Sequence, residues 1–591
     1  MKRFPFLFLL LIVANLNAAD GGCVEPAARR QPNVVLIITD DQGHGDLGFH
    51  GNPKISTPHL DQLAREAVRL DYFYVSPVCA PTRASLMTGR YNYRTGVVDT
   101  YIGRALMDPK EVTLAEMLGE AGYRTGIFGK WHLGDNHPMR PQDNGFQETF
   151  VIKGGGLGQP SDLPGGSSYH DPIVLRNGKP TRAGGYCSDV FTDAAMQFVE
   201  NNAEKPFFAY IAFNAPHGPL EVPNEKLLQK YRSMNLAPEQ FTTTNRAAKG
   251  HPIGKMDSDV TAKVYAMVEN VDSNIGRLLA KLDALRLTRD TIVVFLTDNG
   301  PQQPRYNSGM FQLKGTVYEG GIHVPCFVRW PGQLQAGRSV DRIAAHIDIA
   351  PTLLDLCGVK PPVGVKFDGL SLAPLLRGQK IPWPDRSLYL QWHRGDAPEL
   401  HRCFAARSQE WKLLQPLGNA EGKMPQPVYK LFNMRDDPLE SKDLASTRPE
   451  IVARLLAGYE AWFKDVTGSR DYTVPPTIDI GSAQENPVLL TRQDWRGTRA
   501  GWTPKSLGHW EVNVLRAGDY HVTVRFRPTG QAGRARVLLA GESAEMKFTA
   551  EATEVQFNKV KFPMGKARLN AELMLGNEII GIGSMEVRLL D

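Results

Sequence analysis

Residues 78–90 read VCAPTRASLMTGR, a stretch that predicts a helix with a marked beginning and end. Pro81 suits the first turn of a helix, where its missing N–H costs nothing, and Gly89 suits the position where the helix stops. Cys79 is therefore expected just before the helix N-terminus, where unpaired N–H groups and the helix dipole favour an anion. Arg83 follows one turn later and can point back at the same spot. Cys79 is either a buried core thiol or part of a site that handles anions.

Two apolar runs, one on each side of this helix in the chain, end in oxygen-bearing side chains. NVVLIIT at residues 33–39 precedes Asp40 and Asp41, and TIVVFLT at residues 291–297 precedes Asp298 and Asn299. Such runs are typical of central parallel strands, and open α/β sheets bind ligands beyond the carboxyl ends of their strands. Carboxylate and amide oxygens suit a hard cation such as calcium, whereas zinc prefers histidine and thiolate. Any one of these residues alone could equally be a cap or a solvated turn.

Three further segments carry lysines or histidines. GKWHLG at residues 129–134 lies at the end of a strand predicted from Arg124 to His132, so Lys130 and His132 are expected on one face of it. A strand at the protein surface would show the same alternation. FNAPHGP at residues 213–219 places His217 on a loop rich in Pro and Gly, and Lys314 opens the segment that ends at residue 325.

Together these segments resemble the formylglycine-dependent sulfatases, whose signature is Cys-x-Pro-x-Arg with a Thr-Gly-Arg tail. The resemblance spans roughly residues 33–470 and implies the alkaline-phosphatase-like fold. It implies that a formylglycine-generating enzyme oxidises Cys79 to formylglycine, whose hydrated aldehyde supplies the oxygen that attacks sulfur. It also implies one bound calcium ion, with these ligands: Asp40, Asp41, Asp298, Asn299 and the modified Cys79.

The resemblance assigns roles to the other charged residues of these segments. Lys130 would contact the nucleophile and sulfate, and His132 would contact the formylglycine and help to eject sulfate. His217 becomes a candidate general acid near the leaving alcohol, and Lys314 would contact sulfate and the leaving oxygen. Arg83 and the two lysines, with the metal, would stabilise the charge that develops as the S–O bond breaks.

Three residues of the matched segments have less specific expectations. Glu319 and His323 are expected mainly to pack or to hold loops. His44 would belong to the substrate subsite or support the metal loop. The identity of the sugar would depend on variable loops, at residues 99–109, 154–184 and 242–256.

Composition and the N-terminus set the broad class. The 591 residues suggest two to four domains, and 42% hydrophobic with 22% charged residues fits a globular protein with a large core. A net charge of +5 without a basic stripe does not indicate a nucleic-acid partner. Residues 1–19 predict a cleaved signal peptide, hence a periplasmic or secreted protein, and their apolar run is too short for a membrane span. Six irregularly spaced cysteines favour buried free thiols, although one or two bridges remain open.

The order of predicted elements indicates three structural units. Alternating strands and helices over residues 33–380 predict a doubly wound α/β catalytic domain. Residues 381–473 predict a smaller α+β subdomain, an antiparallel sheet with one helix. Residues 481–591 show strands with period-two alternation and Gly-rich turns, which predicts an appended all-β module similar to a β-sandwich. This module lies outside the resemblance.

The expected function is hydrolysis of a sulfate monoester, on a sulfated carbohydrate or an aryl sulfate. A phosphonate or phosphate ester hydrolase of the same superfamily is the nearest alternative. An inactive binder of sulfated glycans, with the β module as its binding unit, would require a damaged motif. No damage is seen in residues 78–90.

Overall fold

The computed structural model describes residue 1, residues 31–241 and residues 256–590. Its central strand is β1 (Asn33–Thr39), which runs parallel between β8 (Phe207–Ala212) and β9 (Thr291–Thr297). Every residue of β1 and β9 is buried. The two apolar runs therefore form neighbouring strands whose carboxyl ends meet at one edge of the sheet.

A ten-stranded sheet extends from this centre in the order β11-β2-β10-β9-β1-β8-β4-β5-β6-β7. The strands from β9 to β5 are parallel, whereas β10 is antiparallel to β9 and to β2, so the sheet is mixed. The other strands are β2 (Val68–Leu70), β4 (Arg124–Lys130), β5 (Glu148–Ile152), β6 (Ile173–Arg176), β7 (Lys179–Arg182), β10 (Cys326–Arg329) and β11 (Ser339–Val340).

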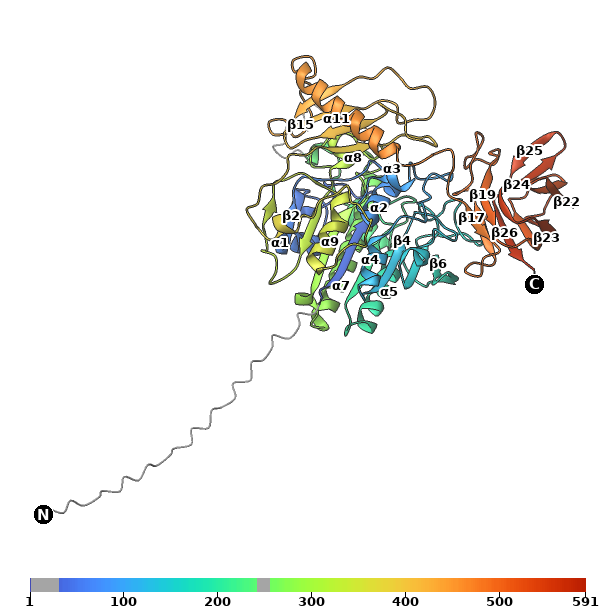
Figure 1. Ribbon diagram of the computed structural model, residues 1–591, viewed down its shortest axis with the longest axis horizontal. Coiled ribbons are helices and arrows are strands. Elements are labelled where there is room, and N and C mark those ends of the chain that lie inside the picture. Colours follow the sequence, from blue (N-terminus) through green and yellow to red (C-terminus); the bar gives the residue numbers. More distant parts are fainter. Residues whose placement is uncertain (2–30, 242–255, 591) are drawn as a thin grey trace.

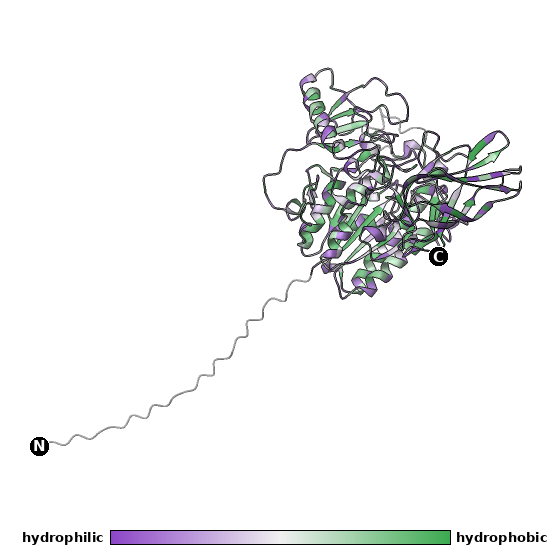
Figure 2. Ribbon diagram, turned by 45° about the vertical axis from the view of Figure 1, so that its right-hand side comes forward, coloured by the Kyte–Doolittle hydropathy of each residue, from purple (hydrophilic) through white to green (hydrophobic). Residues whose placement is uncertain are grey.

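Helices cover both faces of this sheet (Figure 1). Along β1, Val34 and Leu36 enter one hydrophobic core, while Val35 and Ile37 enter the core on the opposite face. The first core is completed by α2 (Cys79–Thr88), α4 (Leu114–Glu120) and α9 (Ile349–Cys357), and the second by α1 (Pro58–Glu66), α5 (Cys187–Asn201) and α7 (Ser258–Ala284). Figure 2 shows the same layering, with hydrophobic strands inside and hydrophilic patches on the outer helices. The predicted doubly wound α/β architecture is confirmed.

One helix is shorter than its hydrophobic spacing predicts. The periodicity after Thr57 continues to Leu70, but α1 ends at Glu66, and residues 68–70 form β2 instead. Val68 pairs with Val328 of β10, so sheet pairing overrides the helical pattern there. Short elements complete the domain: β3 (Phe73–Tyr74), α3 (Asn92–Thr95), α6 (Glu225–Arg232), α8 (Glu319–Ile322), β12 (Ala344–Ala345) and α10 (Ala373–Leu376).

A second sheet follows, with four antiparallel strands in the order β13-β14-β15-β16. Its strands are β13 (Leu388–Gln391), β14 (Phe404–Arg407), β15 (Trp411–Gln415) and β16 (Lys430–Asn433). Leu455 and Tyr459 of α11 (Pro449–Thr467) pack on this sheet. β14 and β15 are separate strands because the chain turns at Ser408, whose N–H donates to Trp411 O at 2.8 Å.

The C-terminal residues form two further sheets, at the right of Figure 1. One has the order β17-β19-β24-β21-β22 with β25 beside β24, and the other has the order β18-β26-β20-β23. Inward side chains of both sheets share one hydrophobic core. The strands are β17 (Ile478–Ile480), β18 (Val488–Thr491), β19 (His509–Val514), β20 (Gly518–Arg525), β21 (Gly533–Leu539), β22 (Glu542–Phe548), β23 (Glu554–Phe562), β24 (Gly565–Leu575), β25 (Glu578–Gly581) and β26 (Ser584–Leu589). We call this unit the β module.

Two expectations concern the N-terminus and the cysteines. The predicted signal peptide and Cys23 lie outside the described residues. The five cysteines that are described are buried and free of disulfide bonds: Cys79, Cys187, Cys326, Cys357 and Cys403. Across residues 31–241 and 256–590, no helix combines the length and the hydropathy that crossing a bilayer requires.

Candidate active site

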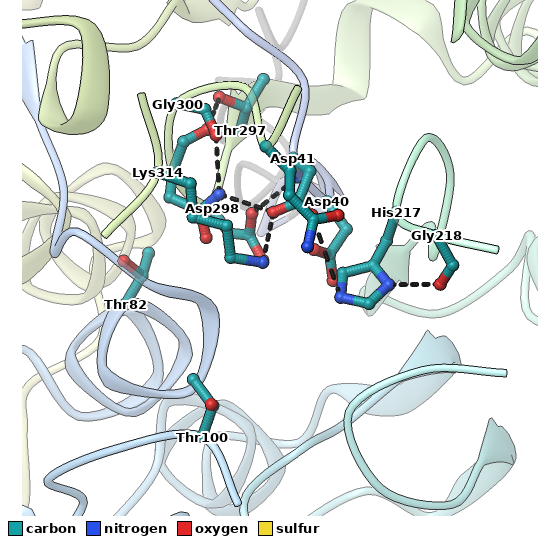
Figure 3. Close-up of polar contacts among 12 residues, drawn as sticks. Asp40, Asp41, Thr82, Thr100, His217, Gly218, Thr297, Asp298, Gly300 and Lys314 are labelled. Atoms are coloured by element: carbon teal, nitrogen blue, oxygen red, sulfur yellow. Dashed lines mark hydrogen bonds and ion pairs between the residues drawn. The ribbon is translucent and has the colours of Figure 1, made fainter. Parts of the chain in front are cut away.

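The four polar side chains that follow β1 and β9 converge at the carboxyl edge of the sheet. Because the two strands pair in register to their last residues, they end level with each other. The Asp41 N–H donates to Asp298 Oδ1 at 3.2 Å, and Asn299 Nδ2 donates to Asp41 Oδ1 at 2.7 Å. Asp40 completes the group, and all four side chains are fully buried. Figure 3 shows the three aspartates side by side.

Three oxygens of this group lack a hydrogen-bond partner among the described residues: Asp40 Oδ1, Asp41 Oδ2 and Asn299 Oδ1. A buried oxygen without a donor is costly, so such groups normally face a water or an ion. Carboxylate and amide oxygens are the ligands that calcium prefers. The residues present therefore fit a hard divalent cation.

Three cationic side chains surround these oxygens. Arg83 Nη2 lies 2.8 Å from Asp298 Oδ2 and 3.1 Å from Asp40 Oδ2. Lys130 Nζ contacts Asp40 Oδ2, and Lys314 Nζ lies 2.5 Å from Asp41 Oδ1. Three cations thus balance three carboxylates, and an added divalent ion would leave a net positive charge that favours an anionic ligand. We call these residues the active-site cluster: Asp40, Asp41, Asp298, Asn299, Arg83, Lys130 and Lys314.

The same contacts set the protonation of two carboxylates. Burial alone would raise the pKa of Asp40, but Lys130, His217 and Arg83 oppose it and hold that pKa well below its usual range. Burial and the neighbouring Asp40 raise the pKa of Asp298 to about 6, against the opposing effect of Arg83. Asp40 is therefore the more strongly ionised of the two.

Cys79 lies beside this cluster as the first residue of α2, one position further into the helix than predicted. Gly89 ends the helix in the left-handed region, with φ of 67°, as the sequence predicts. Cys79 Sγ and one carboxylate oxygen each of Asp40 and Asp298 lie within 4.8 Å of one another. Burial raises the pKa of the Cys79 thiol, so the unmodified side chain is a poor thiolate nucleophile.

His217 lies on the opposite side of the aspartates from Lys314 (Figure 3). Its Nδ1 donates to Gly218 O at 2.6 Å, which leaves Nε2 facing Asp41 Oδ2 at 3.8 Å. Burial lowers the pKa of His217, while Asp41 and Asp40 oppose that shift. A neutral or protonated imidazole with Nε2 directed into the site can exchange protons there.

His132 reaches its place by another route than predicted. β4 ends at Lys130, and His132 takes the left-handed region with φ of 62°, so the two side chains do not share a face of one strand. The chain leaves the sheet because Trp131 enters the core and donates from Nε1 to Met139 O. His132 Nε2 donates to the carbonyl of Thr100 at 2.7 Å, and Nδ1 has no hydrogen-bond partner in the described part of the chain.

A run of three glycines, residues 154–156, packs against the two histidines. A Cβ on Gly155 would lie 2.6 Å from His132 Nε2, and a Cβ on Gly156 would lie 3.2 Å from His217 Cε1. The loop backbone thus packs against both rings, and no side chain fits at Gly155. Residues 154–184 were expected only as a variable loop, although the run of three glycines at 154–156 signals such a close approach.

Sequence reasoning also missed Arg305, a buried residue that holds the loop after β1. Its Nη2 donates to Asp41 O at 2.7 Å, and its guanidinium pairs with both oxygens of Asp46. This contact fixes Asp41, which takes an uncommon left-handed φ of 61°. No local pattern marks Arg305, because it acts on a residue 264 positions earlier in the chain.

Glu319, His323 and His44 contact other side chains that support nearby loops and helices. His323 Nδ1 lies 2.9 Å from Glu319 Oε2, and Lys412 of the second sheet lies 2.8 Å from Glu319 Oε1. The Lys412 contact holds α8 against that sheet, and the His323 contact lies within the segment of α8 and its C-terminal residue. His44 stacks on His50 and lies 2.9 Å from Ser308 Oγ, contacts that suit the support of a loop.

The region that carries these site residues matches a known protein family. A family model described as sulfatase matches residues 32–359, more than half of the chain. N-acetylgalactosamine-6-sulfatase of Canis lupus familiaris is 32% identical over 423 residues, covering 66% of this chain and 72% of that protein. The chain belongs to the sulfatase family. This sulfatase is a sulfuric ester hydrolase, as residues 78–90 predict.

Further comparisons find related sulfatase sequences and solved structures with the same fold. Human arylsulfatase A is 32% identical, over 65% of this chain and 75% of that protein. A second model, described as N-sulphoglucosamine sulphohydrolase, C-terminal, matches residues 307–457. The solved structure of Ps i-CgsB with k-i-k-neocarrahexaose has a TM-score of 0.62 and 27% identity, covering 73% of this chain and 93% of that one. Phosphonate monoester hydrolase of Agrobacterium radiobacter shares the fold at 21% identity and a TM-score of 0.54.

Proposed function

We propose that this sulfatase is exported and removes sulfate from a sulfated carbohydrate, using formylglycine made from Cys79 and one calcium ion. The single observation that carries the catalytic part of this proposal is the convergence at one point of three cationic side chains, Cys79 and three oxygens that have no hydrogen-bond partner among the described residues. Asp40, Asp41, Asp298 and Asn299 would hold the ion. When present, the cation would supply Lewis-acid polarisation, and the hydrated aldehyde at position 79 would supply the nucleophilic oxygen.

The cationic side chains would bind and orient the sulfate group. A sulfate monoester carries one negative charge, so these cations would attract it. Lys314 is the most exposed of the three cationic side chains, with 14% of its side chain accessible. Asp41, Cys79 and Asp40 raise the pKa of Lys314 against the effect of burial, so the lysine stays protonated. Arg83 and Lys130 are fully buried and stay fixed, which places positive charge where negative charge develops.

The two histidines would move protons at different atoms. His217 presents Nε2 to the site and, once protonated, can donate to the leaving alcohol oxygen. His132 is held as the Nε2–H tautomer by Thr100 O, which leaves Nδ1 as a buried base. A base there can take a proton from the hydroxyl of the side chain at position 79 when sulfate is released.

The relatives support a carbohydrate as the substrate. N-acetylgalactosamine-6-sulfatase is named for a sugar sulfate, and Ps i-CgsB was solved with an oligosaccharide. Both exceed 25% identity, over 66% and 73% of this chain respectively. We therefore place sugar sulfates ahead of simple aryl sulfates as substrates, with the latter as convenient test compounds.

Mass spectrometry of the peptide that contains position 79 tests the proposal. After co-expression with a formylglycine-generating enzyme, the peptide should lose one sulfur and two hydrogens and gain one oxygen. The purified protein should then cleave an aryl sulfate faster than the matching aryl phosphate, and a panel of sulfated oligosaccharides should identify the sugar. Full activity with an unmodified thiol at position 79 would disprove the proposal, and fractionation of the producing cells tests export.

A further inference from the structure

One side chain of the β module, Gln493, contacts the segment that holds His132. This residue follows β18 and is 2% exposed. Its Nε2 donates to Thr100 O at 2.9 Å and lies 3.4 Å from His132 Nε2, and its main-chain carbonyl accepts from the Gly103 N–H at 2.8 Å. Gln493 therefore contacts the same carbonyl that orients His132.

The hydrogen bonds fix the orientation of both side chains. Thr100 O accepts from His132 Nε2 at 2.7 Å and from Gln493 Nε2 at 2.9 Å, which uses both lone pairs of that oxygen. If the amide of Gln493 were turned over, its oxygen would face another oxygen. The amide nitrogen therefore points to Thr100, and His132 keeps its proton on Nε2 and its lone pair on Nδ1.

Packing around Gln493 makes this arrangement rigid. A Cβ on Gly154 would lie 3.6 Å from Gln493 Cγ, so the glycine loop beside the two histidines rests against this side chain. Arg496 Nη2 donates to Gly103 O, three residues beyond Thr100. On the other side of the contact, Ile102 and Leu106 are buried in the hydrophobic core of the β module. The module thus holds the segment 100–106 from several directions.

We propose that Gln493 is a positioning residue that acts through His132, so that the β module is part of the catalytic unit. The inference rests on the proposed function, because it requires that His132 works in turnover. Without the Gln493 donor, the Thr100 carbonyl can turn away, and His132 loses its fixed tautomer and place. Outer partners of catalytic groups commonly change rates by about 10–100-fold.

Gln493→Met tests this inference, because methionine has nearly the same length and no donor. In the full-length protein with formylglycine installed, kcat should fall about 10–100-fold while KM changes less than about twofold. Gln556→Met is the matched control: Gln556 is an exposed residue of β23 in the same module. Its kcat should equal that of the wild type. If Gln493→Met melts well below the control, Gln493→Asn, which keeps an amide but cannot reach Thr100, replaces it.

A double-mutant cycle separates this inference from the proposed function. In a His132→Ala background, Gln493→Met should lower kcat by less than about twofold, because the imidazole through which Gln493 acts is already absent. The positioning role would be overturned if Gln493→Met lowered kcat by the same factor with and without His132. It would also be overturned if Gln493→Met alone kept the wild-type kcat. Wild-type kcat in His132→Ala itself would instead refute the catalytic role of His132 in the proposed function.

Discussion

Two of the buried clusters of charged side chains among the described residues differ in a useful way, because one is a candidate active site and the other is not. The first is the active-site cluster at the ends of β1 and β9. The second, which we call the Glu319 cluster, lies between α8 and the second sheet and contains Glu319, Lys412, Glu440, His323 and Tyr74. Both are built from carboxylates and lysines with almost no exposed surface.

The clusters differ in how their oxygens are used. Glu319 Oε1 and Oε2 meet Lys412 and His323, and Glu440 Oε2 accepts from the Glu319 N–H at 2.8 Å. Glu440 Oε1 makes no hydrogen bond among the described residues, but it lies 2.7 Å from the Lys412 ammonium. In the active-site cluster, three oxygens meet no hydrogen-bond donor within the described residues. Burial and charge alone therefore do not mark a site. The active-site cluster differs because three such oxygens, on three neighbouring residues, converge where a ligand could satisfy them, whereas the one such oxygen of Glu440 faces a lysine.

The sharpest test of this contrast exchanges one carboxylate for an amide in each cluster. Asp41→Asn should lower kcat by at least about a thousandfold, because it weakens both the cation site and the anchor of Lys314. Glu440→Gln should stay within about threefold of the wild type, since Glu440 touches no reacting group. Initial rates with an aryl sulfate, normalised to formylglycine content, measure both. Equal losses in the two variants would erase the distinction.

Lys412→Met should have the next largest effect, this time on stability. It leaves Glu319 and Glu440 buried without their shared cation, which we expect to cost about 3–5 kcal/mol. Thermal unfolding measures the loss, and Lys464→Met on the exposed face of α11 is the control. Activity per folded molecule should change less than about threefold. A variant that keeps its stability would show that Lys412 is dispensable to the Glu319 cluster.

Calcium should stabilise only through the active-site cluster. At a hundredfold excess over the dissociation constant, a ligand of the folded state adds about 2.7 kcal/mol. The wild type and Glu440→Gln should therefore melt at higher temperature in calcium than in a chelator, whereas Asp41→Asn should show little difference. Identical melting of the wild type in calcium and chelator would contradict the assigned cation site.

The smallest expected effect is a pH dependence in the Glu319 cluster. Burial raises the pKa of Glu440 to about 7 from 4.5, with Lys412 opposing the shift and Glu319 adding to it. The folded protein then holds a proton that the unfolded chain releases, so Glu440 makes stability fall as pH rises from about 4.5 to 7. The pKa of Glu319 is lowered, and its effect lies below this window.

Glu440→Gln should remove this slope. The melting temperature of the variant should fall less than that of the wild type between pH 5 and pH 7. Glu578→Gln, at an exposed position of β25, should keep the wild-type slope. Parallel curves for wild type and Glu440→Gln would show that Glu440 does not titrate in this range.

The sequence allowed the ends of β1 and β9 to be predicted together, because two parallel strands of the same pattern must end at the same edge. The residues around Cys79 were predicted from a motif whose spacing is local. The position of His132 could not be predicted in this way, because the left-handed turn after β4 depends on where Trp131 packs. Thr100 acts through a main-chain carbonyl, which no residue type reveals, and Gln493 is 361 positions from His132.

The shared core of Ile102, Leu106 and Met139 with the β module bears on how such proteins can be recombined. A truncated chain that stops before β17 would expose these three apolar side chains to water. A chimaera that replaces the module with an unrelated one would remove the contacts that Gln493 and Arg496 make with the segment of residues 100–106. In evolution and in engineering alike, the segment of residues 100–106 and the β module should be inherited as a pair.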